Sequence, residues 1–261
     1  MGRILVHGHR GCRAVRPENT LPAFEHALKV GVDALELDLC VTADDVLVAS
    51  HDPFISEALC RGPAVGVPIR SLTYQQLQQY DCGSLRNPNF PHQTPVPGTR
   101  IPTLDEILRL GGPAGVWFNI ETKMRERPDL APPPEKFAAM VLESVRRHGV
   151  ASRTILQSFD YRSLRAMKKL DPKMRLAALD DIGREDFVTL ARSAQADIIS
   201  PRFDFVTSTK VVAAHAAGLE VVPWTANRPE EWRRLIAAEV DAIITDDPEA
   251  LIAYLKQRGL R

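Results

Sequence analysis

The sequence predicts an α/β fold, a (β/α)8 TIM barrel with a small insertion after the second strand. Short apolar runs with strand character alternate with amphipathic, helix-like segments along the chain. Its 261 residues are close to the roughly 250 of a typical barrel of this kind. Residues 7–11, after the first strand, lack the G-x-G-x-x-G spacing of a dinucleotide-binding open sheet. We therefore expect a single barrel domain over residues 1–261.

Eight strand–helix units account for the alternation. The expected strands are residues 4–6, 34–39, 116–121, 154–158, 175–179, 197–200, 221–224 and 242–245. The helical segments begin near Thr20, Thr103, Pro134, Tyr161, Arg184, Thr207, Pro229 and Pro248, several of them with an Asp, Ser, Thr or Pro start signal. Strands joined in this way by helices run parallel, and eight such units favour closure into a barrel.

The composition is that of a globular protein with a sizeable core. Hydrophobic residues make up 44% of the chain and charged residues 25%, which is not typical of disorder. Lys+Arg 33 against Asp+Glu 33 gives a formal net charge of zero, which argues against nucleic acid or an anionic membrane as the main partner. The first strand follows Met1 almost directly, and no apolar run is long enough to span a membrane. We therefore expect a cytoplasmic protein without stable membrane insertion, unless a leader has been removed.

Four cysteines, Cys12, Cys40, Cys60 and Cys82, show no C-x-x-C spacing. Zinc fingers and thioredoxin-type redox chemistry are therefore poorly supported. Free thiols are expected, because disulfides are rare in the cytosol. Cys60 and Cys82 are the pair that could join across the loop-rich stretch between them.

A tight reversal at residues 41–46 predicts an antiparallel hairpin after the second strand. If Asp44 and Asp45 are the two turn residues, Asp38 lies opposite His51 on the paired strand. Glu36 and Asp38 are two positions apart on one strand, so both side chains point to the same face. We expect two carboxylates and an imidazole to converge here.

Residues 53–102 do not follow the strand–helix alternation. The segment is rich in Pro, Gly, Gln and Asn and has one short helical pattern, near residues 73–80. Long insertions of this kind often cover the mouth of an active site and select the substrate. A surface loop without a functional role explains the pattern equally well. We expect the insertion to overhang the barrel mouth.

Chemically reactive side chains are concentrated in the first fifth of the chain. His9-Arg10-Gly11, Glu36-Leu37-Asp38 and Ser50-His51-Asp52 supply imidazoles, a guanidinium and carboxylates at or near the ends of strand-like runs. The carboxyl ends of parallel barrel strands meet at one mouth, where such folds place their active sites. The three motifs therefore predict a catalytic site.

Six motifs in order and spacing resemble the glycerophosphodiester phosphodiesterase family. They are His9-Arg10-Gly11, Pro17-Glu18-Asn19-Thr20, Glu36-Leu37-Asp38, His51-Asp52-Pro53, Glu121-Thr122-Lys123 and Pro223-Trp224-Thr225. The resemblance spans nearly the whole chain. It implies a TIM barrel, one divalent cation, and hydrolysis of small glycerophosphodiesters to sn-glycerol 3-phosphate and an alcohol.

The chemistry of these residues agrees with that reaction. Glu36, Asp38 and Glu121 offer an oxygen-only ligand set, which suits Mg²⁺ or Ca²⁺ better than zinc or copper. His9 and His51 fit general acid and base roles, because imidazole titrates near neutral pH.

Four further residues are candidates for contact with the substrate. Arg10 presents a planar fork that matches phosphate oxygens, and Lys123 adds a point charge. Trp224 and Phe159 end two barrel strands and could line the glycerol pocket, with core packing as the alternative.

Other polar residues are expected to have structural roles. Glu18 and Asn19 precede the first helix and fit capping or loop bracing, and Asp246-Asp247 fits capping of the last helix better than metal binding. The remaining histidines match no family motif and are expected at the surface or in packing: His7, His26, His92, His148 and His215.

Three rival functions remain open. A phospholipase C or D of similar fold could use paired histidines, but the Glu121–Lys123 spacing and residues 17–20 favour the phosphodiesterase. A barrel that binds phosphodiesters without turning them over would not need every catalytic position. An amidohydrolase relies on histidine-rich metal sites, whereas the ligands here are carboxylates. Nothing in the sequence addresses the oligomeric state.

Overall fold

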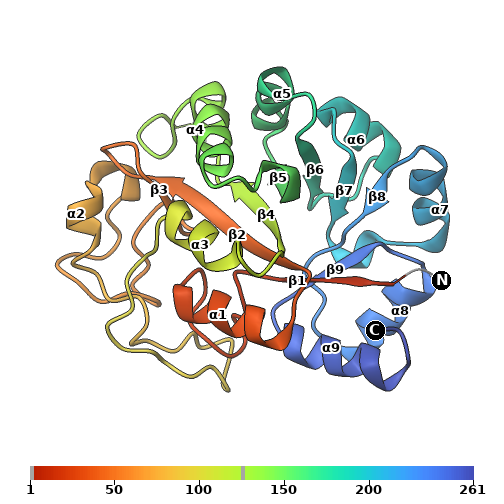
Figure 1. Ribbon diagram of the computed structural model, residues 1–261, viewed down its shortest axis with the longest axis horizontal. Coiled ribbons are helices and arrows are strands. Elements are labelled where there is room, and N and C mark those ends of the chain that lie inside the picture. The colour runs from red at the N-terminus through yellow and green to blue at the C-terminus, as the bar shows by residue number, and fades with distance from the viewer. Residues whose placement is uncertain (1–2, 125–126) are drawn as a thin grey trace.

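The computed structural model describes residues 3–124 and 127–261. Strands and helices alternate through most of the chain (Figure 1). In order they are β1 (Leu5–Gly8), α1 (Leu21–Val30), β2 (Ala34–Val41), β3 (Leu47–Ala49), α2 (Tyr74–Leu77), α3 (Leu104–Gly111), β4 (Trp117–Thr122), α4 (Pro134–Arg147), β5 (Thr154–Ser158), α5 (Tyr161–Leu170), β6 (Arg175–Asp180), α6 (Phe187–Ala194), β7 (Ile198–Pro201), α7 (Ser208–Ala216), β8 (Glu220–Val221), α8 (Pro229–Ala237), β9 (Ala242–Thr245) and α9 (Pro248–Gln257).

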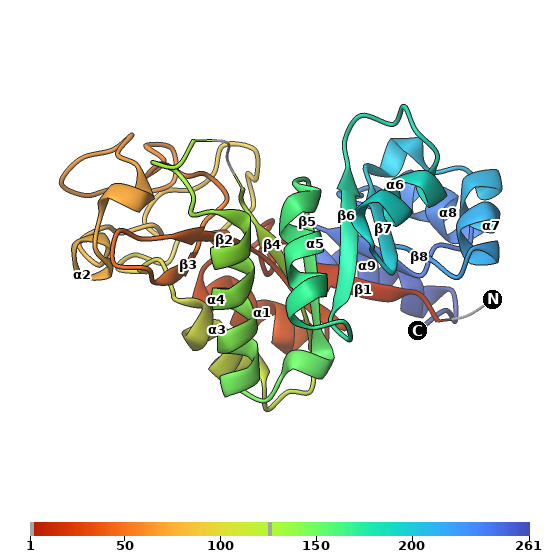
Figure 2. The ribbon, with the colours of Figure 1, turned by 90° about the horizontal axis from the view of Figure 1, so that it is seen from above.

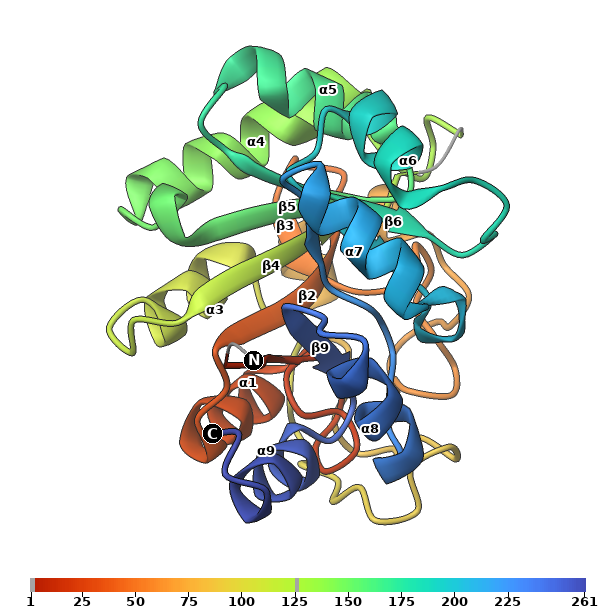
Figure 3. The ribbon, with the colours of Figure 1, turned by 90° about the vertical axis from the view of Figure 1, so that its right-hand side faces the viewer.

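The parallel strands form a nearly closed barrel in the order β8-β7-β6-β5-β4-β2-β1-β9. Three backbone hydrogen bonds bridge the remaining gap, from Asp241 N to Val221 O at 3.0 Å, from Ile244 N to Pro223 O at 3.0 Å and from Ala226 N to Ile244 O at 3.1 Å. Helices lie on the outside of the strands, with α4 and α5 above them and α1, α8 and α9 below them in Figure 3. The predicted TIM barrel is confirmed.

The largest core lies between the strands and the surrounding helices. Phe24, Phe118, Phe137 and Phe187 are fully buried there. A smaller apolar cluster occupies the barrel interior on the β5–β9 side, where Ile155, Ala177, Ile198, Val222, Ala242 and Ile244 meet. The interior on the β2–β4 side is instead polar, and this contrast determines where the charged groups described below can be placed.

Local signals explain most helix starts. Thr103 forms a capping box with Glu106 and begins α3, as predicted. The helix expected near Arg184 begins three residues later, because Asp186 is the residue whose side chain accepts from Thr189 N. The seventh barrel strand, β8, is shorter than the expected residues 221–224 and spans only Glu220–Val221.

The predicted hairpin is present, but its register differs by one residue. Leu39 faces Ala49, so Asp38 faces Ser50 rather than His51, and Ser50 N donates to Asp38 O at 3.0 Å. The loop has three residues rather than two, because Asp45 takes a left-handed conformation at φ 60° before the strand resumes. A sequence does not reveal this extra loop residue unless it is a glycine.

The insertion forms a small apolar cluster of its own against the β2–β3 hairpin. Its buried residues include Ile55, Ile69, Leu77 and Tyr80. Figures 1 and 2 show this segment, with α2, beyond β3 and far from β7 and β8. The expectation of a lid over the barrel mouth is not met, since the insertion packs on the outside of the hairpin.

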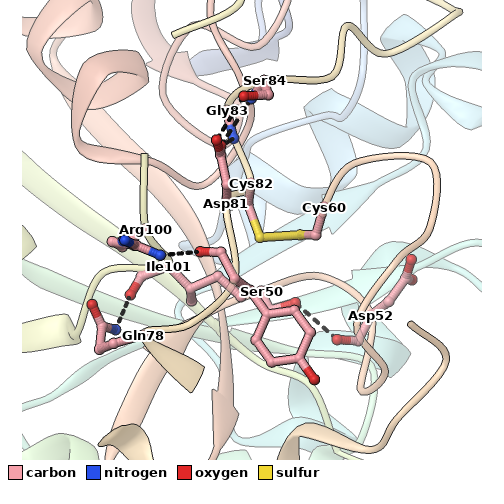
Figure 4. The surroundings of a disulfide bond; sticks show 11 residues. Ser50, Asp52, Cys60, Gln78, Asp81, Cys82, Gly83, Ser84, Arg100 and Ile101 are labelled. Carbon is pink, nitrogen blue, oxygen red and sulfur yellow. Dashed lines mark hydrogen bonds between the residues drawn. A yellow bond between two sulfur atoms is a disulfide. The ribbon is translucent and has the colours of Figure 1, made fainter. Parts of the chain in front are cut away.

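A disulfide joins Cys60 and Cys82 in the insertion (Figure 4). The flanking residues Arg61 and Asp81 exchange two backbone hydrogen bonds, at 2.7 and 2.8 Å, which places the two cysteines directly opposite each other. The expectation of free thiols is therefore wrong for this pair. Cys12 and Cys40 are buried and form no disulfide.

Among residues 3–124 and 127–261, no helix is both long enough and apolar enough to cross a lipid bilayer. Both ends of the described chain are tied to one carboxylate. Arg3 Nη2 lies 2.6 Å from Asp33 Oδ1, and the Arg261 guanidinium pairs with the same side chain.

His7 on β1 makes the fold sensitive to acid. It is 3% exposed, and burial lowers its pKa from 6.5 to about 4 despite the opposing charge of Asp33. The unfolded chain therefore binds a proton at His7 more readily than the folded chain does. Above pH 6.5 the His7 side chain is neutral in both states and does not lower the free energy of unfolding, whereas it lowers this free energy progressively as the pH falls from 6.5 toward 4.

We expect wild-type protein to lose about 2 kcal/mol through His7 alone between about pH 7 and about pH 4.5. The variant His7→Leu cannot titrate at this position and should lose correspondingly less over the same interval. Urea unfolding of both proteins at the two pH values isolates the difference from all other titrating groups. Equal pH dependence in the two proteins would contradict this assignment.

Candidate active site

A cavity of about 230 Å³ opens at the carboxyl ends of the barrel strands. Side chains from both halves of the barrel line it: His9, Arg10, Glu36, His51, Glu121, Lys123, Gln157, Phe159, Leu179, Asp181, Trp224 and Ile244. Eight of the nine predicted site residues are in this set, and Asp38, the ninth, lies directly beside Glu36 and Glu121. The predicted site residues are therefore brought together.

Three carboxylates form the buried base of the site. Asp38 on β2 and Glu121 on β4 are partners in the parallel register, and Glu36 precedes Asp38 by two residues. One oxygen from each of the three lies within 4.8 Å of the others. Their exposed fractions are only 1–7%, so their charges need compensation from within the protein.

The electrostatics of the three carboxylates differ. Burial, and then repulsion from Asp38, raises the pKa of Glu36, and burial likewise raises the pKa of Glu121. Burial would also raise the pKa of Asp38, but the charges of Arg10 and Lys123 hold it well below its ordinary value. The negative charge of Asp38 is therefore stabilised within the protein. Additional positive charge nearby would stabilise the charged forms of Glu36 and Glu121.

Two cations and an amide surround Asp38. Arg10 Nε lies 3.0 Å from one carboxylate oxygen, and Asn19 Nδ2 donates to the same oxygen at 2.9 Å. Lys123 Nζ is 3.4 Å from the other oxygen and 2.6 Å from Glu121 Oε1. Asn19 thus braces the site, in keeping with its expected structural role.

Glu36 is held on both oxygens. The backbone N–H of Arg10 donates to Oε2 at 2.9 Å, and Gln157 Nε2 donates to Oε1 at 2.7 Å. Asn119 Nδ2 in turn donates to Gln157 Oε1 at 3.2 Å, inside the barrel. These contacts orient the carboxylate from below and leave it directed at the cavity.

The turn after β1 is conformationally demanding. Arg10 has φ 51° and Gly11 has φ 85°, both in the left-handed region. A Cβ on Gly11 would come within 2.6 Å of the Ala23 backbone, so only glycine fits this position. The strained turn is what directs the Arg10 N–H at Glu36 while its guanidinium reaches Asp38.

The insertion supports this turn from outside. Arg10 Nη1 is 2.5 Å from Glu18 Oε1, and Asn87 Nδ2 donates to the other oxygen of Glu18 at 3.2 Å. Gln93 Nε2 donates to the carbonyl oxygens of Arg13 and Arg16, at 2.7 and 3.0 Å. Within the described chain, the insertion braces the Arg10 loop rather than lining the cavity.

His9 is paired with an aspartate at the end of the last strand. His9 Nδ1 lies 2.5 Å from Asp246 Oδ1, and Asn227 Nδ2 donates to the second Asp246 oxygen at 2.7 Å. Burial lowers the pKa of His9 although Asp246 opposes this shift. With Nδ1 engaged, Nε2 is the nitrogen that faces the carboxylates, 4.0 Å from Glu36 Oε2.

His51 enters the cavity from the end of the hairpin. Its Nδ1 lies 2.9 Å from Asp52 Oδ1, and its side chain is 37% exposed, against 12% for His9. The two imidazoles therefore have the same arrangement, with a carboxylate at Nδ1, but differ in their access to solvent.

The opposite wall of the cavity is aromatic. The rings of Phe159 and Trp224 meet edge to face, with centroids 5.5 Å apart and an interplanar angle of 84°. Trp224 Nε1 donates to Ser200 O at 2.9 Å, which anchors the indole. Phe159 is 41% exposed, so the packing alternative accounts for it poorly. Trp224 lines the cavity but also packs against the apolar cluster of the barrel interior, so it serves both purposes.

Comparison with known proteins identifies the family. Residues 9–250 match the Glycerophosphoryl diester phosphodiesterase family. The chain belongs to this family. It is 32% identical to a glycerophosphodiester phosphodiesterase of Caldanaerobacter subterraneus over 98% of this chain and 100% of that protein. The predicted family and the predicted enzyme class, a phosphoric diester hydrolase, are confirmed.

Solved structures share the fold. A crystal structure from Silicibacter pomeroyi, assigned to the glycerophosphoryl diester phosphodiesterases, has a TM-score of 0.92 at 32% identity, covering 99% of this chain and 95% of that one. A phosphodiesterase of Oleispira antarctica, solved with the product sn-glycerol 3-phosphate, has a TM-score of 0.83 at 23% identity, covering 97% of each chain. The latter likeness shows the common barrel.

Sequence reasoning missed three polar residues of the site. Gln157 orients Glu36, Asp246 orients His9, and Asp181 lines the cavity from the loop after β6. Of the expected pair Asp246-Asp247, only Asp247 caps α9, accepting from Ala250 N at 2.9 Å. All three missed residues lie at the carboxyl ends of strands, and this position was the available signal.

Proposed function

We propose that this protein hydrolyses small glycerophosphodiesters to sn-glycerol 3-phosphate and an alcohol, using one divalent cation and two histidines. The observation that carries the proposal is the convergence of three buried carboxylates, two imidazoles and two basic side chains on one cavity. A phosphodiester is anionic and slow to hydrolyse, so its catalyst must offset phosphoryl charge, activate the attacking oxygen and protonate the departing alcohol. This set of groups can supply each of these functions.

Glu36, Asp38 and Glu121 would hold the cation. The three carboxylates offer only oxygen ligands, which favours Mg²⁺ or Ca²⁺. Burial raises the pKa of Glu36 and Glu121, and a divalent cation would remove that penalty on their charged forms. When bound, such a cation acts as a Lewis acid toward phosphoryl oxygen.

Arg10 and Lys123 would contact the phosphate. Both line the cavity beside the carboxylates. Their ion pairs with Glu18, Asp38 and Glu121 fix where their positive charge lies before substrate arrives, which lowers the reorganisation needed on binding.

His9 and His51 would transfer the protons. One imidazole takes a proton from the attacking oxygen, and the other gives a proton to the alcohol oxygen as its bond to phosphorus breaks. Asp246 holds Nδ1 of His9, so the exchange would take place at Nε2, as in other carboxylate–imidazole pairs.

Phe159 and Trp224 would contact an organic part of the substrate. A cavity of about 230 Å³ suits a small diester better than a two-chain phospholipid. Two alternative functions fit the site less well. A protein that only binds phosphodiesters would not need the two imidazoles. An amidohydrolase would need histidine ligands for its metal, whereas this cluster consists of carboxylates.

The proposal is tested on purified protein with a panel of glycerophosphodiesters, coupling release of glycerol 3-phosphate to its dehydrogenase. Exhaustive chelation should abolish turnover, and Mg²⁺ or Ca²⁺ should restore it. The variant Glu121→Gln should not be restored, whereas Glu143→Gln on the exposed surface of α4 should behave as wild type. Activity that survives chelation would show that the reaction does not require the cation. Hydrolysis of intact phospholipid at the same rate as glycerophosphodiesters would favour the phospholipase alternative.

A second experiment concerns Asp246. The variant Asp246→Asn keeps the shape but presents an amide to His9 Nδ1, which favours the wrong tautomer, so kcat should fall by roughly two to four orders of magnitude with a smaller change in KM. Asp247→Asn, the same change one residue later, should have little effect, because Asn caps a helix as well as Asp. Wild-type kcat in Asp246→Asn would show that this carboxylate does not orient the proton-transfer group.

A further inference from the structure

The cavity is divided into two chemically different halves. Ionic groups from β1 to β4, among them Arg10, Glu36 and Lys123, line one half. The other half is lined by Phe159, Leu179, Trp224 and Ile244 from the ends of β5, β6, β8 and β9. A phosphate on the ionic half would therefore direct one of its two ester substituents against an apolar, aromatic wall.

The aromatic wall has two faces at right angles. Phe159 and Trp224 meet at 84°, and the Phe159 side of the pair is open, since that residue is 41% exposed. The indole N–H of Trp224 is used by Ser200 O and so cannot serve a substrate hydroxyl. Two perpendicular ring faces without a free donor form the kind of surface that accepts an organic cation through its quadrupoles.

Asp181 adds a negative charge to this half. It is exposed in the loop after β6 and lines the same cavity as the two rings. Within residues 3–124 and 127–261 it forms no hydrogen bond or ion pair. Arg202 is within electrostatic range, but its guanidinium is bound by Asp204, at 2.7 and 2.8 Å, and lies over the Phe205 ring. The carboxylate of Asp181 is thus available to a ligand.

We propose that Phe159, Trp224 and Asp181 form a head-group subsite that selects diesters of a cationic, quaternary ammonium alcohol of the choline class. This inference rests on the proposed function and deepens it, by naming the alcohol that leaves. The two rings contact the methyl groups of the cation, and Asp181 supplies the opposite charge.

The glycerol moiety fits this half less well. Its hydroxyls need hydrogen-bond partners, and burying them against rings and aliphatic side chains without partners is unfavourable. Apart from Asp181, the polar side chains that line this half are already engaged. Trp224 donates to Ser200 O, and Gln157 donates to Glu36 and accepts from Asn119. A quaternary ammonium has no N–H to satisfy, so it loses less on entering an aromatic, weakly hydrated pocket.

Three diesters test the assignment: glycerophosphocholine, glycerophosphoglycerol, and the glycerophosphodiester of 3,3-dimethylbutanol, which has the shape of choline without its charge. Wild-type protein with cation should show kcat/KM for the choline diester about tenfold above that for its uncharged isostere. In Asp181→Asn this ratio should fall about fivefold, and Asp181→Glu should recover part of it, since the contribution comes from an exposed charge. Glu185→Gln removes the same charge from the same loop but outside the cavity, and should leave the ratio unchanged.

The outcomes distinguish failure of the head-group subsite from failure of the proposed hydrolase function. Equal kcat/KM for choline diester and isostere, or an unchanged ratio in Asp181→Asn, overturns the head-group subsite while leaving the hydrolase intact. A ratio that falls equally in Glu185→Gln also overturns it, because a diffuse surface potential would then account for the preference. Absence of turnover on all three diesters contradicts the proposed function itself.

Discussion

Asp38 and Glu121 are Cα partners on two adjacent parallel strands, and Glu36 lies on the same face of β2, so the barrel concentrates three carboxylates in a region with almost no access to water. Buried charges of like sign are strongly unfavourable unless opposite charge and hydrogen bonds are supplied locally. The rest of the site can be understood as the response to this constraint. Arg10 and Lys123 supply positive charge, and Asn19 and Gln157 supply hydrogen bonds.

Supporting contacts extend this response well beyond the cavity. The left-handed turn at Arg10 and Gly11 directs one backbone N–H at Glu36, and Glu18, held from the insertion by Asn87, fixes the guanidinium. The insertion thus acts on the site through the loop it braces. The aromatic half of the cavity bears none of this charge, so it is free to recognise an organic substituent.

The barrel and the main site residues could be predicted because both depend on local patterns. Strand periodicity located Glu36 and Asp38 on one face, and motif spacing located His9, His51 and Glu121. The predicted hairpin register was wrong by one residue. Asp45 takes a left-handed conformation and adds a third loop residue, and the sequence has no glycine there that would have indicated it. The Cys60–Cys82 pairing and the Asp246–His9 contact depend on long-range packing, which spacing along the chain does not encode.

The central claim is that the three carboxylates form the cation site around which the other groups are arranged. A crystal soaked in Mn²⁺, with data collected at the manganese absorption edge, tests it most directly, since Mn²⁺ accepts the same oxygen ligands as Mg²⁺. The account predicts one strong anomalous peak bounded by oxygens of Glu36, Asp38 and Glu121. A peak held by other residues, or no peak at this cluster at saturating Mn²⁺, would contradict it.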